Sequence, residues 1–171
     1  MVALPFYFEQ TLGRSPVQTG LLMTPWPLMT ALVAPVAGRL SDRLRPEKIS
    51  SVGLVLFAAG LGSLALLSDT ASAWDIAWRM GLCGLGFGLF QSPNNRVIVS
   101  SAPRERSGGA AGLQSMGRLL GQSAGAVGVA LAFGLLAQQH PTPLICAGAA
   151  LLSLLAAIAS GLRDPRAAMK S

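Results

Sequence analysis

The chain has 171 residues, of which 51% are hydrophobic and only 12% are charged, against roughly 25% charged residues in ordinary globular domains. Its formal net charge of +6 does not indicate nucleic-acid binding, because the basic residues stand at the ends of apolar segments and form no continuous basic face. Composition and charge therefore exclude an ordinary soluble domain and favour a helical protein whose immediate partner is the lipid bilayer.

The first apolar segment is too short to cross a bilayer. Residues 2–8 are apolar and end in the aromatic cluster Phe6-Tyr7-Phe8, and Arg14 follows soon after. A spanning helix needs about 20 apolar residues to cross a hydrocarbon core of ~30 Å. We expect this segment to be the outer end of a helix whose cytoplasmic half is missing. An interfacial anchor, for which the aromatic cluster is also suited, is the alternative.

Five later stretches have the length and apolar character of membrane spans. They cover residues 18–38, 49–68, 75–99, 108–136 and 143–162. The first is broken by Pro25, Pro27 and Pro35. We therefore predict an all-α, polytopic transmembrane helical bundle over residues 1–162, with about five full spans and a truncated N-terminal helix, followed by a tail over residues 163–171.

The distribution of basic residues predicts the orientation of the bundle. Nine basic residues stand in the connections after the first and third spans and in the tail: Arg39, Arg43, Arg45, Lys48, Arg104, Arg106, Arg163, Arg166 and Lys170. The alternate connections contain only Arg14. Because cytoplasmic connections of membrane proteins are enriched in lysine and arginine, we expect a cytoplasmic C-terminus and an outer Arg14.

Several side chains near the span ends have ordinary structural interpretations. Trp26 stands near a predicted outer boundary and is interpreted as a residue of the interfacial aromatic belt. Asp75 precedes Arg79 by four residues, the spacing of an ion pair on one helix. Arg96 near the inner end of the third span is interpreted as an anchor whose side chain reaches the interface.

The third span carries three amides on one helical face. Gln91, Asn94 and Asn95 have the spacing i, i+3 and i+4. Uncharged amides in hydrocarbon need hydrogen-bond partners, so this face must point into the bundle or toward a water-filled cavity. Two interpretations stay open, the wall of a substrate cavity and polar contacts between helices. Pro93, beside these amides, removes one helical hydrogen bond and favours a kink.

The fourth span carries two neighbouring stripes. Gly117, Gly121 and Gly125 recur every four residues and predict a close helix–helix contact. Gln114, a further cavity candidate, stands one turn before Arg118 on the second stripe. A charge at the depth of Arg118 costs at least ~2.5 kcal/mol, so it needs a partner or water. Conformational coupling, a structural counter-charge and snorkelling are the three open interpretations.

The sequence contains no pattern of an enzyme, a metal site or a cofactor site. Cys83 and Cys146 each stand inside an apolar run and are interpreted as small buried hydrophobic residues. The glycines at 84, 86 and 88 lack the strand–turn context of a dinucleotide-binding loop. No phosphate-binding loop, zinc-protease motif or nucleophile elbow occurs in the sequence. We therefore expect neither catalysis nor a cofactor.

Four passages resemble the major facilitator superfamily of transporters. The turn Gly38-Arg39-Leu40-Ser41-Asp42-Arg43 resembles the G-x-L-x-D-R signature that connects the second and third helices of each six-helix half. Residues 86–95 look like the fourth helix of the C-terminal half in multidrug-efflux members, and residues 102–112 with 118–125 resemble the loop and helix that follow. Residues 13–20 are similar to the outer loop that opens this half. The resemblance covers nearly the whole chain and is closest to the fourteen-helix drug:proton antiporter branch.

The resemblance implies a fold and a function. It places the chain as a C-terminal fragment, the last five helices of the C-terminal half preceded by the end of a sixth. The implied function is proton-coupled efflux of small organic molecules or drugs across the bacterial inner membrane, by alternating access, within a larger transporter. The missing N-terminal half or another membrane polypeptide would be its partner and would supply any proton-carrying carboxylate.

Two alternatives accompany the resemblance. Gly38, Asp42 and Arg43 would form a cytoplasmic conformational latch, whereas the simpler interpretation of these residues is a loop that only orients the protein. A truncated, non-transporting membrane protein that acts only by associating with another polypeptide is the alternative to the transporter.

Overall fold

The computed structural model is a bundle of helices. It describes residues 3–68, 70–100, 103, 107–135 and 142–161. Its elements are α1 (Ala3–Phe6), the π-helical turn η1 (Tyr7–Thr11), α2 (Pro16–Met23), α3 (Pro25–Ser41), α4 (Pro46–Ala65), α5 (Ala73–Ser100), α6 (Ser107–Leu135) and α7 (Thr142–Gly161). No strand occurs among the described residues. The all-α prediction is confirmed, and the tail over residues 163–171 lies outside the described residues.

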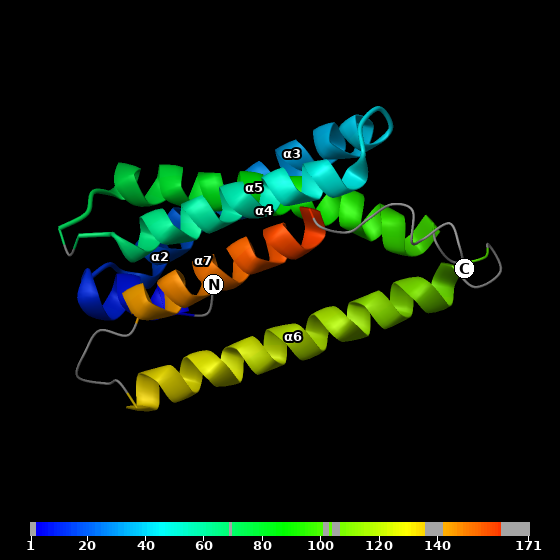
Figure 1. Cartoon of the computed structure of the whole chain (residues 1–171). Helices are drawn as coiled ribbons and strands as arrows, with labels where there is room; N and C mark the ends of the chain where they lie inside the picture. The colour runs from blue at the N-terminus through cyan, green and yellow to red at the C-terminus, as the bar shows by residue number, and fades with distance from the viewer. Residues whose placement is uncertain (1–2, 69, 101–102, 104–106, 136–141, 162–171) are drawn as a thin grey trace.

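Four of the five predicted spans are long and apolar enough to cross a membrane. They are Pro16–Ser41, which combines α2 and α3, then Pro46–Ala65, Gly108–Leu135 and Thr142–Ala159. The remaining predicted span, α5, has 28 residues but is not among these candidates. Asp75 and Arg79 near its start and the polar stretch from Gln91 to Arg96 near its end both lower its hydropathy. Helix α5 packs between α3 and α4, which cover much of its surface (Figure 1).

The predicted break in the first span lies at Thr24, between α2 and α3. Pro25 has no N–H and therefore cannot donate to the carbonyl of Leu21. The N–H of Thr24 donates to that carbonyl instead, at 3.2 Å. The Thr24 hydroxyl then donates to the Gly20 carbonyl, at 2.9 Å. The break thus leaves both carbonyls satisfied, as a helix inside hydrocarbon requires.

Glycines let α5 contact both of its neighbours backbone to backbone. A Cβ added at Gly84 would lie 2.3 Å from the carbonyl oxygen of Trp26 on α3. A Cβ added at Gly86 would lie 2.3 Å from the backbone nitrogen of Phe57 on α4. These separations are too short for any side chain, so the close helix contacts of this chain depend on glycines of α4 and α5.

The main hydrophobic core lies at the end of the bundle away from the α3–α4 turn. We name the end that carries this turn (residues 42–45) the basic end, and the other the far end. Tyr7 and Phe8 of η1 belong to the core, together with residues of α2, α4, α5 and α7. Phe8 is fully buried. The interpretation of this aromatic cluster as an interfacial anchor is therefore wrong for Tyr7 and Phe8, because helices cover them.

Trp26 also lies inside the bundle. Its ring centroid is 5.4 Å from that of Phe57 and 5.5 Å from that of Phe87, so it joins an aromatic cluster among α3, α4 and α5. Its interpretation as a belt residue is wrong, because its partly buried ring packs against residues of α4 and α5.

Helix α6 stands apart from the other helices. It approaches α5 at the basic end and diverges from the bundle toward the far end (Figure 1). None of its membrane-spanning window is buried. Nothing lies within 4 Å of a Cβ added at Gly117, Gly121 or Gly125. No contact within the described chain therefore corresponds to the predicted glycine interface, which stays a prediction for a helix outside this chain.

Candidate functional site

Helix α5 presents three different faces to its surroundings. Gly84, Gly88 and Ser92, spaced by four residues, face α3. Cys83 and Gly86 face α4. Gln91 and Asn95 follow Gly84 and Gly88 by seven residues, so they lie at the edge of the face that meets α3. Together with Asn94 they form an amide strip on α5. Within this amide strip, Asn95 contacts α6, as described below.

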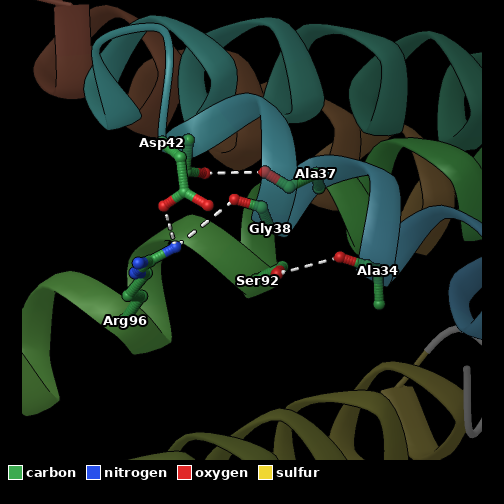
Figure 2. Close-up of polar contacts among 7 residues, drawn as sticks. Ala34, Ala37, Gly38, Asp42, Ser92 and Arg96 are labelled. Atoms are coloured by element: carbon green, nitrogen blue, oxygen red, sulfur yellow. Dashed lines mark hydrogen bonds and ion pairs between the residues drawn. The ribbon is translucent and has the colours of Figure 1, made fainter.

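At the basic end, α5 is tied to the α3–α4 turn by polar contacts (Figure 2). Arg96 forms an ion pair with Asp42 and donates a hydrogen bond to the Gly38 carbonyl at 3.4 Å. One turn away, the Ser92 hydroxyl donates to the Ala34 carbonyl at 3.1 Å. The ion pair is half-exposed, with relative accessibilities of 58% for Arg96 and 52% for Asp42. It is a surface contact that small helix motions can break and remake.

The structure divides the three residues of the predicted latch. Gly38 and Asp42 both contact Arg96. Arg43 makes no ion pair or hydrogen bond with Arg96 and lines, together with Asp42, a shallow surface groove of about 420 Å³. The sequence analysis assigned Arg96 to anchoring at the interface and missed its part in this network. The available signal was the carboxylate of Asp42 in a segment rich in arginines, but spacing along the chain does not identify which arginine binds it.

The amide strip of α5 meets α6 near the basic end. The side-chain amide of Gln114 on α6 donates to the side-chain oxygen of Asn95 on α5. Gln91 and Asn94 are half-buried, and their side-chain amides make no hydrogen bond among the described residues. The four amides predicted from sequence therefore include one bonded pair and two accessible groups free to bind water or a ligand.

Arg118 follows Gln114 by one helical turn and lies on the same strip of α6. Its side chain is exposed, and it makes no ion pair or hydrogen bond within the described part of the chain. One turn further, Gln122 lines a groove of about 830 Å³ between α6 and α7, together with Gly125, Gly148 and other small residues. No counter-charge for Arg118 is found among the described residues.

An apolar groove lies on the far half of the bundle between α2, α3 and α5. Its volume is about 750 Å³, and its walls include Leu28, Met29, Trp74, Trp78 and Leu85. The sequence analysis did not find this groove. The two tryptophans, four residues apart on α5, were the available signal, but they are equally typical of a membrane interface.

At the far end, Arg79 does not pair with Asp75 as its spacing predicted. Arg79 donates to the carbonyl of Ser63 in the last turn of α4, and its guanidinium lies 5.3 Å from the Trp78 ring centroid. Asp75 instead accepts from the Ser72 hydroxyl at 3.1 Å, at the start of α5. A carbonyl near a helix C-terminus carries partial negative charge, so it attracts Arg79 strongly.

Both cysteines are buried, which confirms their interpretation as small hydrophobic residues. Cys83 packs against Gly60 of α4, and Cys146 belongs to the main hydrophobic core. Within the described residues, no group of three histidine, cysteine, aspartate or glutamate side chains is arranged to hold a metal ion.

Comparison with known proteins agrees with this architecture. The family model of the Major Facilitator Superfamily matches residues 1–171. The chain is 53% identical over 95% of its length to the uncharacterized transporter YebQ of Escherichia coli, covering 35% of that relative. It is 36% identical over 61% of its length to the riboflavin transporter RibZ of Clostridioides difficile, covering 23% of it.

A third relative is a tetracycline resistance determinant of Streptomyces rimosus, 31% identical over 80% of this chain and 39% of the relative. The chain thus spans between 23% and 39% of the length of these relatives.

Proposed function

Because the chain belongs to the Major Facilitator Superfamily, whose members are membrane transporters and not enzymes, we propose that it forms one wall of an efflux transporter in the bacterial inner membrane. It would move small organic molecules or drugs outward, in exchange for protons, by alternating access with a second helical bundle. That second bundle would be the N-terminal half of a longer polypeptide or a separate membrane protein. In this proposal the basic end is cytoplasmic, as is the C-terminus.

The accessible amides of α5 carry this proposal. Within the described part of the chain, Gln91 and Asn94 place unbonded donors and acceptors on a helix that packs between α3 and α4. Such groups are costly in hydrocarbon and are retained where a helix lines a polar path. Purely structural amides would be bonded between helices, as Asn95 and Gln114 are. The two unbonded amides therefore support a substrate-facing wall.

The Asp42–Arg96 contact would serve as the latch of this transporter. It joins the α3–α4 turn to α5 at one end of the bundle, and it is half-exposed. An exposed pair contributes roughly 0–1 kcal/mol, an amount suited to biasing two conformations without locking either. Breaking the pair would let the turn and the basic end of α5 separate when the cavity changes the side to which it opens.

The names of the relatives support efflux as the direction of transport. They include a multidrug resistance protein of Mycobacterium tuberculosis, 31% identical over 79% of this chain, as well as the tetracycline resistance determinant. The apolar groove beside Trp74 and Trp78 suits the apolar part of such molecules. The only carboxylates in the described helices are those of Glu9, Glu47 and Asp75, near helix ends. The proton carrier would therefore belong to the second bundle.

The proposal is tested by supplying that second bundle. Residues 1–171 are joined to the preceding region of the Escherichia coli relative and expressed in an efflux-deficient strain. Export of the cation ethidium and of an anionic fluorescent dye is measured with and without a proton gradient, and export of either dye supports the proposal. We expect gradient-dependent export from the hybrid and none from the 171-residue chain alone, although both insert in the membrane.

A hybrid that inserts, folds and exports no dye or drug would contradict the proposed function. That outcome would favour a non-transporting protein that acts by associating with another polypeptide. Robust export by residues 1–171 alone would contradict the requirement for a second bundle of different sequence, and would point to two copies of this chain.

A further inference from the structure

We propose that Gln91 and Arg118 bind an anionic oxygen group of the transported molecule, such as a carboxylate, phosphonate or sulfonate. This inference rests on the proposed function and names the substrate class at the same wall. It starts from the charge of Arg118, which no described residue neutralises.

The helix register places Gln91 and Arg118 at the same level. Helices α5 and α6 follow one another along the chain and run in opposite directions, and the Asn95–Gln114 hydrogen bond fixes their relative position. Moving one turn toward the far end leads from Asn95 to Gln91 on α5, and from Gln114 to Arg118 on α6. Both residues therefore stand one turn from the bonded pair, on the far-end side of it. Helix α6 diverges from the bundle in the same direction (Figure 1).

Arg118 lies too deep for its charge to be explained by the interface. It stands eleven residues after Ser107, where α6 begins, which corresponds to ~16 Å along the helix axis. That is about half of a hydrocarbon core of ~30 Å. An unpaired guanidinium at this depth is strongly disfavoured unless it faces water or an anion.

The surrounding charges favour an anionic ligand over a cationic one. No aspartate or glutamate occurs between residues 76 and 104 or between residues 106 and 163. The nearest described acidic group at the basic end, Asp42, is already paired with Arg96. The potential along this part of α5 and α6 is therefore positive, which attracts anions and repels cations.

The donor groups match the geometry of an oxyanion. A guanidinium presents a planar fork of N–H groups that binds two oxygens of one carboxylate or phosphonate. The free amides of Gln91 and Asn94 add further N–H donors on the opposite helix. If Arg118 only paired with one acidic side chain of another helix, the amides of Gln91 and Asn94 would have no role. The surplus of donors thus favours a ligand with several acceptor oxygens.

The test uses the full chain in nanodiscs of uncharged phosphatidylcholine and a matched pair of probes. 1-Pyrenebutyrate carries the carboxylate, and its methyl ester differs only by lacking the charge. Binding is followed by energy transfer from the tryptophans to pyrene, with empty nanodiscs as the partition control. We expect saturable binding of the anion at least about tenfold tighter than of the ester, the size of a charge-assisted hydrogen-bond effect.

Three variants make the assignment specific. Arg118→Gln should remove the preference for the anion and leave ester binding unchanged, whereas Arg118→Lys should keep part of that preference. Arg45→Gln, at the basic turn, is the matched control and should change nothing. Circular dichroism and monodisperse elution verify that each variant folds.

Equal affinities for the two probes, absence of saturable anion binding, or an unchanged preference in Arg118→Gln would overturn the inference. Loss of probe binding when phosphatidylglycerol replaces phosphatidylcholine would also overturn it, by assigning the site to a lipid headgroup. Failure of the proposed function is a separate result, since it is read from export by the hybrid in cells and not from binding of the probes to residues 1–171.

Discussion

Substituting alanine for Gly86 should separate α4 from α5, whereas the same substitution at Gly121 should be harmless to this chain. The added Cβ at Gly86 would lie 2.3 Å from the backbone nitrogen of Phe57 and 2.8 Å from the carbonyl oxygen of Gly53. Both obstacles are backbone atoms, which no rotamer change can move. Since ordinary contact begins near 3.4 Å, the two helices must separate by about 1 Å, which disrupts a packed interface.

Two effects of a glycine-to-alanine substitution change the free energy of unfolding in opposite directions. Overpacking of this kind costs about 1–3 kcal/mol and occasionally more, while replacing a helical glycine by alanine gains up to ~1 kcal/mol of helix propensity in soluble hosts. Gly86→Ala should therefore destabilise the chain by about 1–2 kcal/mol. Gly121→Ala, with nothing within 4 Å, should be neutral or stabilising by a fraction of ~1 kcal/mol.

The assay is reversible unfolding in mixed micelles of mild detergent and sodium dodecyl sulfate, followed by tryptophan fluorescence and circular dichroism. Folded yield by fluorescence-detected size exclusion is the second measurement. Equal unfolding midpoints for the two variants would refute the reasoning, because it rests entirely on the different surroundings of the two glycines. If Gly121→Ala instead destabilised the protein, Gly121 would contact a helix that is not among the described residues.

Three further predictions concern the ends of the bundle. In the hybrid transporter, Asp42→Asn should reduce export several-fold. The free energy of unfolding should change by less than ~1 kcal/mol, because the Asp42–Arg96 pair is exposed. Equal losses of export and of folded yield would contradict a latch. Single cysteines at Ser41 and Ser72, in a cysteine-free background, should react with an impermeant maleimide from opposite sides of the membrane, and labelling from one side would contradict the span count. Arg79→Gln should lower the unfolding free energy by ~1 kcal/mol through loss of the bond to Ser63, whereas the exposed Arg45→Gln should not; identical unfolding curves for the two variants would show that the bond is dispensable.

The local pattern of the sequence predicted the helices well, because each helix follows from a property of its own residues. The apolar runs predicted α4, α6 and α7 close to their observed bounds. Pro25 predicted the break at Thr24, whereas α3 continues through Pro27 and Pro35, which were also expected to break the span. The spacing of Gln91, Asn94 and Asn95 predicted a polar face on α5. Such periodicities do not depend on which helix is the neighbour.

The sequence did not predict which residues of different helices contact each other. Arg79 and Arg96 each had a local interpretation, an ion pair with Asp75 and an anchor at the interface. In the structure they bind Ser63 and Asp42, residues distant along the chain. Long side chains reach several neighbours, so spacing along one helix does not decide among partners on another.

The sequence by itself determined that this chain is an all-α membrane protein, where its helices begin and end, and which side chains are polar within them. Only the tertiary structure decided which glycines are in close contact, because Gly86 and Gly121 both recur in small-residue patterns yet only Gly86 has a helix against it. It also decided that Gln91 and Arg118 stand at the same level of α5 and α6. The physical reason is that helix periodicity fixes the direction of each side chain, whereas its neighbour depends on how separate helices pack.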